Sequence, residues 1–323
     1  MTLSVNLLMT CSVAIFVMLY IDENHKVPLF KKYHTTNNIC AVIYDQLTEI
    51  LTEALYDSLT VTPIDLTNKD LKFRQELIDK EIHAFDFLEE NQMTLELEEA
   101  LVKHVTMSIL GDFVNFVYES LSCAQRGKME VAYSLLRKPF LDELLIFEQI
   151  LIDRTDFINR FYHKGEPKLY DPSDKAINKK EIIQKSLEQI RNTHFFSDEL
   201  IYTLRYDKSS TSGINGISNQ ALHIVTNDPN YRTNDQELNF VFSVKEDHLR
   251  YWDHYYYFVP HLLFYSVAVI DEILFKYVSG EVAQAHKTVK ELRRMICFLL
   301  LSEKNHKSKK QKSNLNQVYE VSK

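Results

Sequence analysis

Glycine and proline are scarce in this chain, which excludes architectures that need many tight turns. The 323 residues include six glycines and seven prolines, fewer than turn-rich β-sandwiches and β-barrels use. Long stretches with apolar residues at helical spacing dominate the sequence instead. We therefore predict an all-α protein, a multi-helix bundle.

Cysteines are few, and the sequence motifs of several enzyme classes are absent. The four cysteines are isolated, with neither a CxxC pair nor a metal-ligand spacing, so we expect a reducing, cytoplasmic environment and no disulfide framework. The chain has no P-loop, GxGxxG, GxSxG or HExxH motif. Nucleotide hydrolysis, dinucleotide binding, serine hydrolysis and zinc-protease chemistry therefore lose their usual sequence support, and we expect no metal and no cofactor.

Residues 1–21 contain no charged side chain. A stretch of this length is long enough to cross a bilayer. The segment has no basic region and no small-residue cleavage pattern, which argues against a cleaved signal peptide. Two interpretations stay open: a membrane anchor, or a segment buried in the protein or against a partner. Because Lys26, Lys31 and Lys32 follow the segment, an anchor would keep the body of the protein cytoplasmic.

Residues 129–153 carry the strongest helix pattern in the chain. At about 100° per residue, one face collects apolar side chains; they are Ala132, Tyr133, Leu136, Phe140, Leu144, Phe147 and Leu151. We predict a buried central helix that Pro139 kinks. Arg137 and Glu143 lie at the margins of the buried face and need partners, either as structural ion pairs or in a functional site. Lys138 and Asp142 point outward as a solvent-exposed pair.

Further helices are predicted on both sides of the central one, at 37–59, 67–91, 94–122, 154–165, 173–194, 195–206, 245–279 and 281–302. Residues 217–226 return to apolar spacing between two loops. The alternation in 238–244 allows either a strand or the start of a helix. The domain organisation is then an uncharged segment at 1–21, a single large helical domain at 37–303 and a basic flexible tail at 304–323.

The predicted helix 245–279 carries a polar edge beside its apolar face. Asp247, Arg250, His254, Tyr257 and His261 recur at spacings of 3, 4, 3 and 4. One turn separates a guanidinium that can hold a phosphate from an imidazole that can move a proton. The alternative is a row of hydrogen-bonded aromatic residues and ion pairs that stabilises the bundle.

The stretch AYSLLRKPFLDELLIFEQILID, followed later by SNQALHIVT, resembles the HEPN-like class of all-helical proteins, and within it uncharacterised bacterial members. The resemblance covers residues 94–280 and implies that Arg137 faces His223 across the bundle. Active HEPN ribonucleases have an arginine and a histidine separated by four to six residues. No arginine here has that spacing, since only three residues separate Arg250 from His254, so ribonuclease activity does not carry over directly.

The sequence patterns and the resemblance leave two functions open. The first is a HEPN-like protein that binds RNA or cleaves it without a metal, in phage defence or a toxin system. Its candidate catalytic residues are Arg137, His223, Arg250 and His254, and its candidate binding residues are Glu143, Tyr257 and His261. The second is a non-catalytic helical interaction protein, tethered to a membrane through 1–21. The resemblance also implies a homo-oligomer, because HEPN-like proteins commonly pair.

Overall fold

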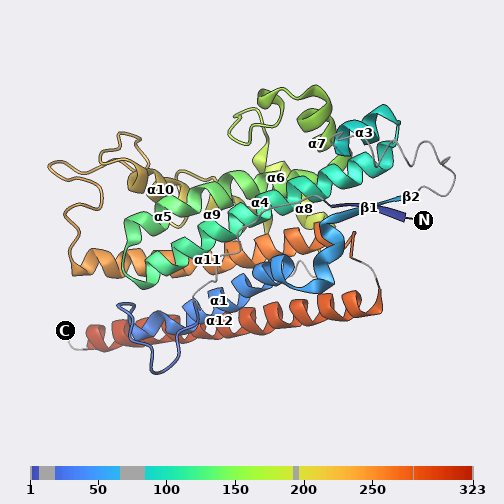
Figure 1. Ribbon diagram of the computed structural model, residues 1–323. Coiled ribbons are helices and arrows are strands. Elements are labelled where there is room, and N and C mark those ends of the chain that lie inside the picture. Colours follow the sequence, from blue (N-terminus) through green and yellow to red (C-terminus); the bar gives the residue numbers. More distant parts are fainter. Residues whose placement is uncertain (1, 7–18, 66–83, 192–195, 279, 322–323) are drawn as a thin grey trace.

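The computed structural model describes residues 2–6, 19–65, 84–191, 196–278 and 280–321; side chains are described within 19–63, 84–191, 196–278 and 280–304. Eleven α-helices and one pair of short strands lie in these residues. The all-α prediction is confirmed. The strands β1 (Thr2–Asn6) and β2 (Val61–Asp65) are antiparallel, with Thr2 opposite Asp65, and they lie at one end of the bundle (Figure 1).

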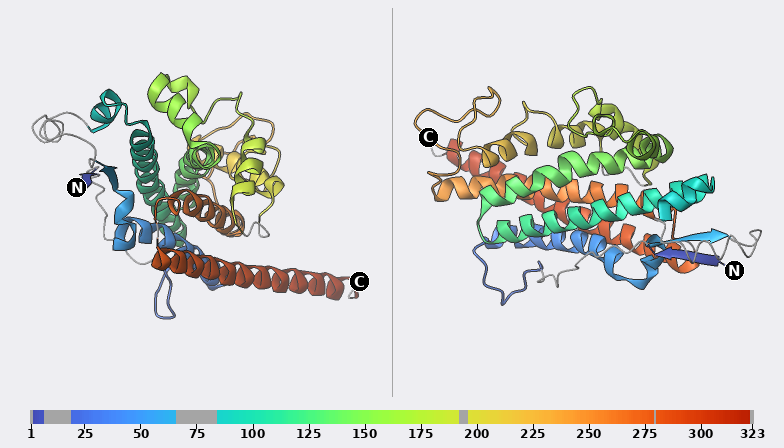
Figure 2. Two further views of the ribbon diagram at one scale, coloured as in Figure 1. Left: turned by 90° about the vertical axis from the view of Figure 1, so that its right-hand side faces the viewer. Right: turned by 45° about the horizontal axis from the view of Figure 1, so that its top comes forward.

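Long helices run side by side along the molecule (Figures 1 and 2). They are α1 (Lys31–Thr52), α4 (Thr94–Gln125), α11 (Lys245–Leu274) and α12 (Glu281–Val321). Helix α1 packs against α4, α11 and α12. Helices α4 and α11 in turn contact the central helical segment, so the central segment is wrapped as predicted.

The central segment consists of α5 (Met129–Arg137), a π-helix η2 (Lys138–Glu143) and α6 (Leu144–Ile152). Leu136, Phe140, Leu144 and Phe147 are fully buried, which confirms the central position. Pro139 has no N–H to give to the α-helical ladder, and a π segment begins next to it: the N–H of Leu144 bonds the carbonyl of Pro139, five residues back.

This π segment changes which charges meet. In a π-helix, neighbours are five residues apart rather than four. Nζ of Lys138 therefore lies 3.4 Å from Oε1 of Glu143, and Lys138 also pairs with Asp112 of α4. The pair of Lys138 with Asp142 that a regular α-helix predicts is therefore not formed. Lys138 pairs with Asp112 and Glu143 instead, and Asp142 interacts electrostatically with Arg137.

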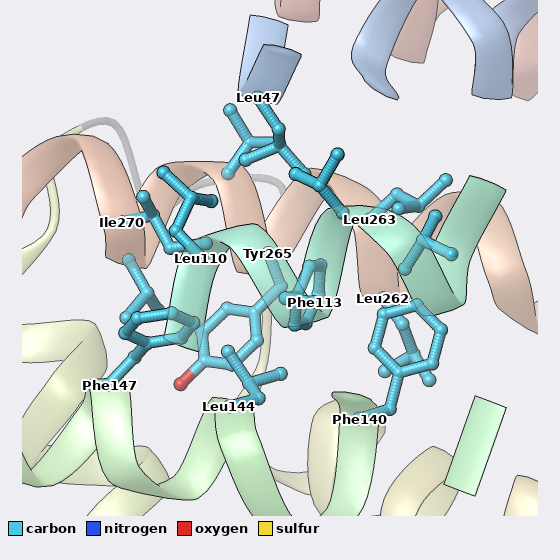
Figure 3. Packing of buried hydrophobic residues seen from close by; sticks show 14 of the residues in the cluster. Leu47, Leu110, Phe113, Phe140, Leu144, Phe147, Leu262, Leu263, Tyr265 and Ile270 are labelled. Atoms are coloured by element: carbon cyan, nitrogen blue, oxygen red, sulfur yellow. The ribbon is translucent and has the colours of Figure 1, made fainter. Parts of the chain in front are cut away.

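The core lies where α4, the central segment and α11 meet. Figure 3 shows Phe113 between Phe140 and Phe147, with Leu262 and Tyr265 of α11 beside them. The ring centroid of Phe113 lies 5.8 Å from that of Phe140, in an edge-to-face arrangement. Such aromatic contacts fix helix positions more closely than aliphatic packing alone.

Shorter elements cover the flanks of the long helices. They are the 3₁₀ turn η1 (Ala54–Leu59), α3 (Ala84–Glu90), α7 (Arg154–Ile158), the π turn η3 (Asn159–Lys164), the 3₁₀ turn η4 (Pro167–Leu169), α8 (Lys179–Gln189), α9 (Asp198–Arg205) and α10 (Ile214–Leu222). Helix α8 packs on α6, and α10 packs on α5. These contacts place α10 and the loop after it at one end of the central segment (Figure 1).

Several predicted boundaries differ from the observed ones, and part of one predicted helix lies outside the described residues. Helix α1 covers Lys31–Thr52 where 37–59 was predicted, and α8 covers Lys179–Gln189 where 173–194 was predicted. Residues 238–244 form turns, neither strand nor helix. Helix α12 continues to Val321, beyond the end expected near Ser302, because neither glycine nor proline interrupts 304–323. Within the predicted basic tail, the backbone is thus helical as far as Val321. Of the predicted helix 67–91, residues 66–83 lie outside the described part of the chain.

Within the part of the chain that the structure describes, two helices, α4 and α11, are long and apolar enough to cross a membrane. In the structure 67% and 83% of their most apolar windows are buried, and the core helices of a bundle pass the same test. The membrane-anchor prediction concerned another stretch, 1–21. Residues 1 and 7–18 of it lie outside the described residues, whereas Leu19 and Ile21 are buried in the core.

Candidate functional site

The loop between α10 and α11, residues 223–244, is held in shape by short polar side chains. The N–H of Thr226 donates to Oγ1 of Thr233 at 2.8 Å, and the N–H of Thr233 donates to the carbonyl of Thr226 at 2.9 Å. Oγ1 of Thr233 donates to Oδ1 of Asn239, and Nδ2 of Asn239 donates to the carbonyl of His223. These side chains replace backbone partners and give the loop a defined shape.

A polar pocket of about 220 Å³ lies between this loop and the first turns of α11. Its lining includes Gln220, Arg232, Asn234, Phe242, Asp247 and Arg250. The side chains of Arg250 and Arg232 are 78% and 67% exposed, and Phe242 is 63% exposed. We call it the arginine pocket, because Arg232 and Arg250 both line it. Glu237 lines it as well, and Arg232 lies 3.8 Å from Asp235.

Asp247 fixes the position of Arg250 at this pocket. One of its carboxylate oxygens accepts the N–H of Val244 at the start of α11, and the other pairs with Arg250. These two hydrogen bonds hold the pKa of Asp247 below its usual value. A guanidinium has five N–H donors, and the contact to Asp247 uses one terminal nitrogen. The remaining donors are available to an anionic ligand such as a phosphate.

His254 lies one turn further along α11 in a different environment. Its Nδ1 is 3.1 Å from the hydroxyl of Tyr133, and its ring packs on Phe258. Burial lowers its pKa to about 4, although hydrogen bonding to the backbone of 211–213 acts in the opposite direction. His254 is therefore neutral at pH 7 and engaged inside the protein, whereas Arg250 points into the pocket.

Arg137, the last residue of α5, and His223, the residue after α10, are both exposed, and the two helices pack against each other. Arg137 interacts electrostatically with Asp142 and with Tyr231 of the loop. His223 ends α10, and its carbonyl accepts the hydrogen bond from Asn239. Of the four predicted catalytic residues, Arg250 alone lines the arginine pocket.

The predicted binding residues Tyr257 and His261 lie further along α11. Nδ1 of His261 is 2.8 Å from the carbonyl of Tyr257, and their ring centroids are 5.8 Å apart. Burial lowers the pKa of His261, with the Tyr257 carbonyl acting against it. These two residues contact each other and are not part of the arginine pocket lining.

Glu143, the third predicted binding residue, is a buried carboxyl group that contacts the partly exposed Asp112 and Lys138. Burial and, to a smaller extent, the hydrogen bond and charge of Asp112 together raise the pKa of Glu143 to about 9, although Lys138 acts in the opposite direction. The pKa of Asp112 is lowered: its partial burial acts upward, but hydrogen bonds with Glu143 and Lys138 outweigh it. The cluster therefore consists of a neutral Glu143 beside an ion pair of Asp112 with Lys138, rather than two charged carboxylates.

This cluster gives a pH-dependent prediction for Glu143→Gln. The unfolded chain ionises this carboxyl near its ordinary pKa of 4.5, whereas the folded protein holds it protonated up to about pH 9. Ionisation of the unfolded chain therefore favours unfolding increasingly between these two values. At pH 7 we expect glutamine, which cannot ionise, to raise the free energy of unfolding by about 3 kcal/mol.

Urea titrations at several pH values check this expectation. The gain should be near zero at about pH 4, below the pKa of the unfolded carboxyl, and should grow as the pH rises. Glu130→Gln is the matched control, since Glu130 is an exposed residue of the neighbouring α5. A Glu143→Gln gain that is the same at every pH would contradict a protonated Glu143.

Sequence reasoning missed several residues that the structure singles out. Arg232 lies in the loop 223–244, where no periodic pattern marks it, and Phe242 lies in the stretch 238–244, whose alternation left a strand and a helix start both open. Arg205 and Glu148 form a fully buried ion pair between α9 and α6. A signal for Glu148 existed, because it follows Leu144 by four residues and so falls on the apolar face of the central helix.

The comparisons with known proteins give no further guide to the site. No family model, no curated protein and no solved structure matches this chain. Among the described residues, no group of three or more histidine, cysteine, aspartate or glutamate side chains is placed to hold a metal ion. The functional argument therefore rests on the arginine pocket and its surroundings.

Proposed function

We propose that this chain is a HEPN-like helical protein that binds single-stranded RNA at the arginine pocket without cleaving it there. The observation that carries the proposal is the exposure of Arg232, Arg250 and Phe242 on one pocket. Guanidinium groups bind phosphates through charge-assisted hydrogen bonds. An exposed aromatic ring stacks on an unpaired base, which a duplex does not offer.

The packing of α10 on α5 supports the HEPN-like part of the proposal. The resemblance in sequence implies an arginine-bearing helix that faces a later histidine. Helix α5 ends at Arg137, α10 ends just before His223, and the two helices pack together. Binding without cleavage is favoured because Nδ1 of His254 is engaged with the hydroxyl of Tyr133 and burial lowers the pKa of His254 to about 4. An imidazole with so low a pKa is a weak base, so His254 is poorly suited to take a proton from RNA beside Arg250.

Fluorescence anisotropy with a labelled single-stranded RNA tests the proposal. We expect salt-dependent binding, since the contacts are to phosphates. Arg232→Ala and Arg250→Ala should each weaken binding about tenfold, the effect of losing roughly 1.5 kcal/mol of charge-assisted hydrogen bonding. Phe242→Ala should weaken it by a similar factor through lost stacking. Arg191→Ala is the control, since Arg191 lines a separate cavity.

Two results would contradict this function. Equal affinity in the wild type and in an Arg232→Ala and Arg250→Ala double variant would remove the pocket from RNA binding. Cleavage of the RNA to fragments with 2′,3′-cyclic phosphate ends, abolished by His254→Ala, would replace simple binding by ribonuclease activity. A role in phage defence or a toxin system depends on the RNA binding and stays part of this proposal.

The second candidate is a non-catalytic helical interaction protein. It is favoured by exposed apolar side chains in the same loop region, namely Leu222, Ile224, Val225, Val241, Phe242 and Val244. Apolar patches of this kind mark protein or membrane contacts. If the labelled RNA does not bind, this candidate replaces the first. A tether through 1–21 would then be tested by comparing membrane fractions of the full chain and a chain lacking these residues.

A further inference from the structure

Helix α12 carries large apolar side chains that face solvent. Within residues 281–304, where side chains are described, they are Val282, Val289, Leu292, Met295, Ile296, Leu299 and Leu300, all between 40% and 73% exposed. Single exposed apolar residues are common on protein surfaces. A row of seven on one helix is unusual and needs a partner surface.

The spacing of this row is that of a coiled coil. With Val282 at heptad position a, the further a positions are Val289 and Ile296, and the d positions are Ala285, Leu292 and Leu299. β-Branched residues at a with leucine at d favour two parallel strands. The partner that this composition specifies is therefore one further parallel helix, and a second α12 has the matching pattern.

The remaining two exposed residues fit the same arrangement. Met295 occupies a g position and Leu300 an e position, and in a parallel dimer g of one helix lies beside e of the next heptad on the other helix. Met295 of one chain would thus lie against Leu300 of the other. All seven exposed apolar side chains of α12 then lie in or beside one seam.

The rest of the protein leaves room for a second copy. The b and f positions of α12 face the bundle: Lys290 and Cys297 are buried at b, and Lys287, Arg294 and Leu301 point inward at f. On a helical wheel these positions lie about 150° from the a/d seam. Two bundles would therefore sit on opposite outer sides of a paired α12, as Figure 2 allows, with α12 at the edge of the molecule.

We propose that this chain forms a parallel homodimer through the a/d seam of α12, residues 282–300. The seam is short for an isolated coiled coil, but its helix is already fixed by packing on the bundle. The conformational entropy of forming the helix is therefore lost when the chain folds, and association does not have to supply it. This inference is independent of the RNA proposal, since it uses a different surface.

Sedimentation equilibrium of the full chain tests the dimer. We expect twice the chain mass of 38.0 kDa for the wild type, and a single chain mass for Leu292→Glu and Ile296→Glu. Both changes lie at exposed positions, so circular dichroism should show an unchanged fold. Leu95→Glu is the matched control, because Leu95 is 80% exposed on α4, and it should stay dimeric.

Disulfide cross-linking tests the orientation. In a parallel pair, position 292 of one chain faces position 292 of the other, so Leu292→Cys should form a covalent dimer under mild oxidation. Gln284→Cys, at an outward c position, should not form one.

A wild type of single chain mass at every concentration would overturn the proposal, as would a dimer that survives both glutamate variants. Flotation of a monomeric protein with phosphatidylglycerol vesicles would assign the seam to a membrane instead, and a dimer without the Leu292→Cys cross-link would overturn the parallel arrangement.

Discussion

Replacing Arg205 by methionine is expected to lower the free energy of unfolding by about 3 to 5 kcal/mol, the usual cost of breaking a buried ion pair from one side. Arg205 and Glu148 are both completely buried. Nε of Arg205 donates to the carbonyl of Phe140 at 2.7 Å, and the hydroxyl of Tyr265 donates to Glu148 at 2.6 Å. Methionine fills similar space but leaves Glu148 charged and without its cation.

The position of this pair explains why its loss should be so costly. Phe140 lies in the π segment, and the hydroxyl of Tyr206 donates to the carbonyl of Leu141 in the same segment. Helix α9 thus supplies side-chain donors to backbone carbonyls where the regular ladder is disturbed. The change removes a salt-bridge partner and a backbone hydrogen bond together.

Guanidinium titrations of four proteins measure the effect: wild type, Arg205→Met, Glu148→Leu and the double variant. The double variant should recover most of the lost stability, because two apolar side chains leave no unpaired charge in the core. Additive losses in the double variant would show that the pair is not coupled. The exposed pair of Lys185 and Glu181 on α8 is the control, and Lys185→Met should leave the free energy of unfolding essentially unchanged.

Helix positions were the part of the fold most open to prediction. The starts expected at 94, 129 and 245 agree with α4, α5 and α11. In these helices the apolar period persists through many turns, and packing reinforces it. The end of α12 was missed, because lysine-rich sequence was interpreted as unstructured although lysine is a good helix former.

The π segment shows a limit of a regular helical wheel. Pro139 was expected to disturb the central helix, and it does. A wheel with a constant angle cannot show that the ladder would shift by one residue and bring Lys138 to Glu143. The sequence could identify Glu143 as a charge near the buried face. It could not identify Asp112, on another helix, as its hydrogen-bonding partner.

The candidate site was only partly open to prediction. Arg250 was found because it belongs to a periodic polar edge. The environment of His254 depends on Tyr133 and on the backbone of 211–213, which only the tertiary fold brings together. Arg232 and Phe242 lie in a loop fixed by side-chain hydrogen bonds. The alternation in 238–244 suggested a regular element there and gave no sign that Phe242 would be exposed at a pocket.

A second large effect is expected for Asp271→Asn, which should lower the free energy of unfolding by about 3 to 5 kcal/mol at pH 7. Asp271 of α11 accepts from Nζ of Lys290 at 2.7 Å and from Arg294, both on α12. Lys290 is fully buried, and its other partners are the carbonyl of Gln46 and the hydroxyl of Tyr56. Asparagine keeps the shape of the side chain but leaves the buried ammonium without its counter-charge.

The pH dependence separates this electrostatic effect from a packing defect. Burial alone would raise the pKa of Asp271, but Lys290 and Arg294 outweigh it and lower the pKa below its usual 3.8. A carboxyl group with a lowered folded-state pKa stabilises the protein above the unfolded pKa and loses that contribution as the pH falls through the folded one. The difference between wild type and Asp271→Asn should therefore be full at pH 7 and shrink in acid below about pH 4.

Urea titrations across this pH range, with Lys290→Met and an Asp271→Leu and Lys290→Met double variant, complete the test. The double variant should be more stable than either single variant, since it removes both the buried carboxylate and the buried ammonium. Arg294 keeps its hydrogen bond to the side chain of Gln46 at 2.9 Å. A loss that is equal at neutral and acid pH would point to packing alone. Because this cluster joins α11 to α12, Asp271→Asn should also weaken the proposed dimer. Arg205→Met lies in the contact between α9 and α6 and should leave the dimer mass unchanged.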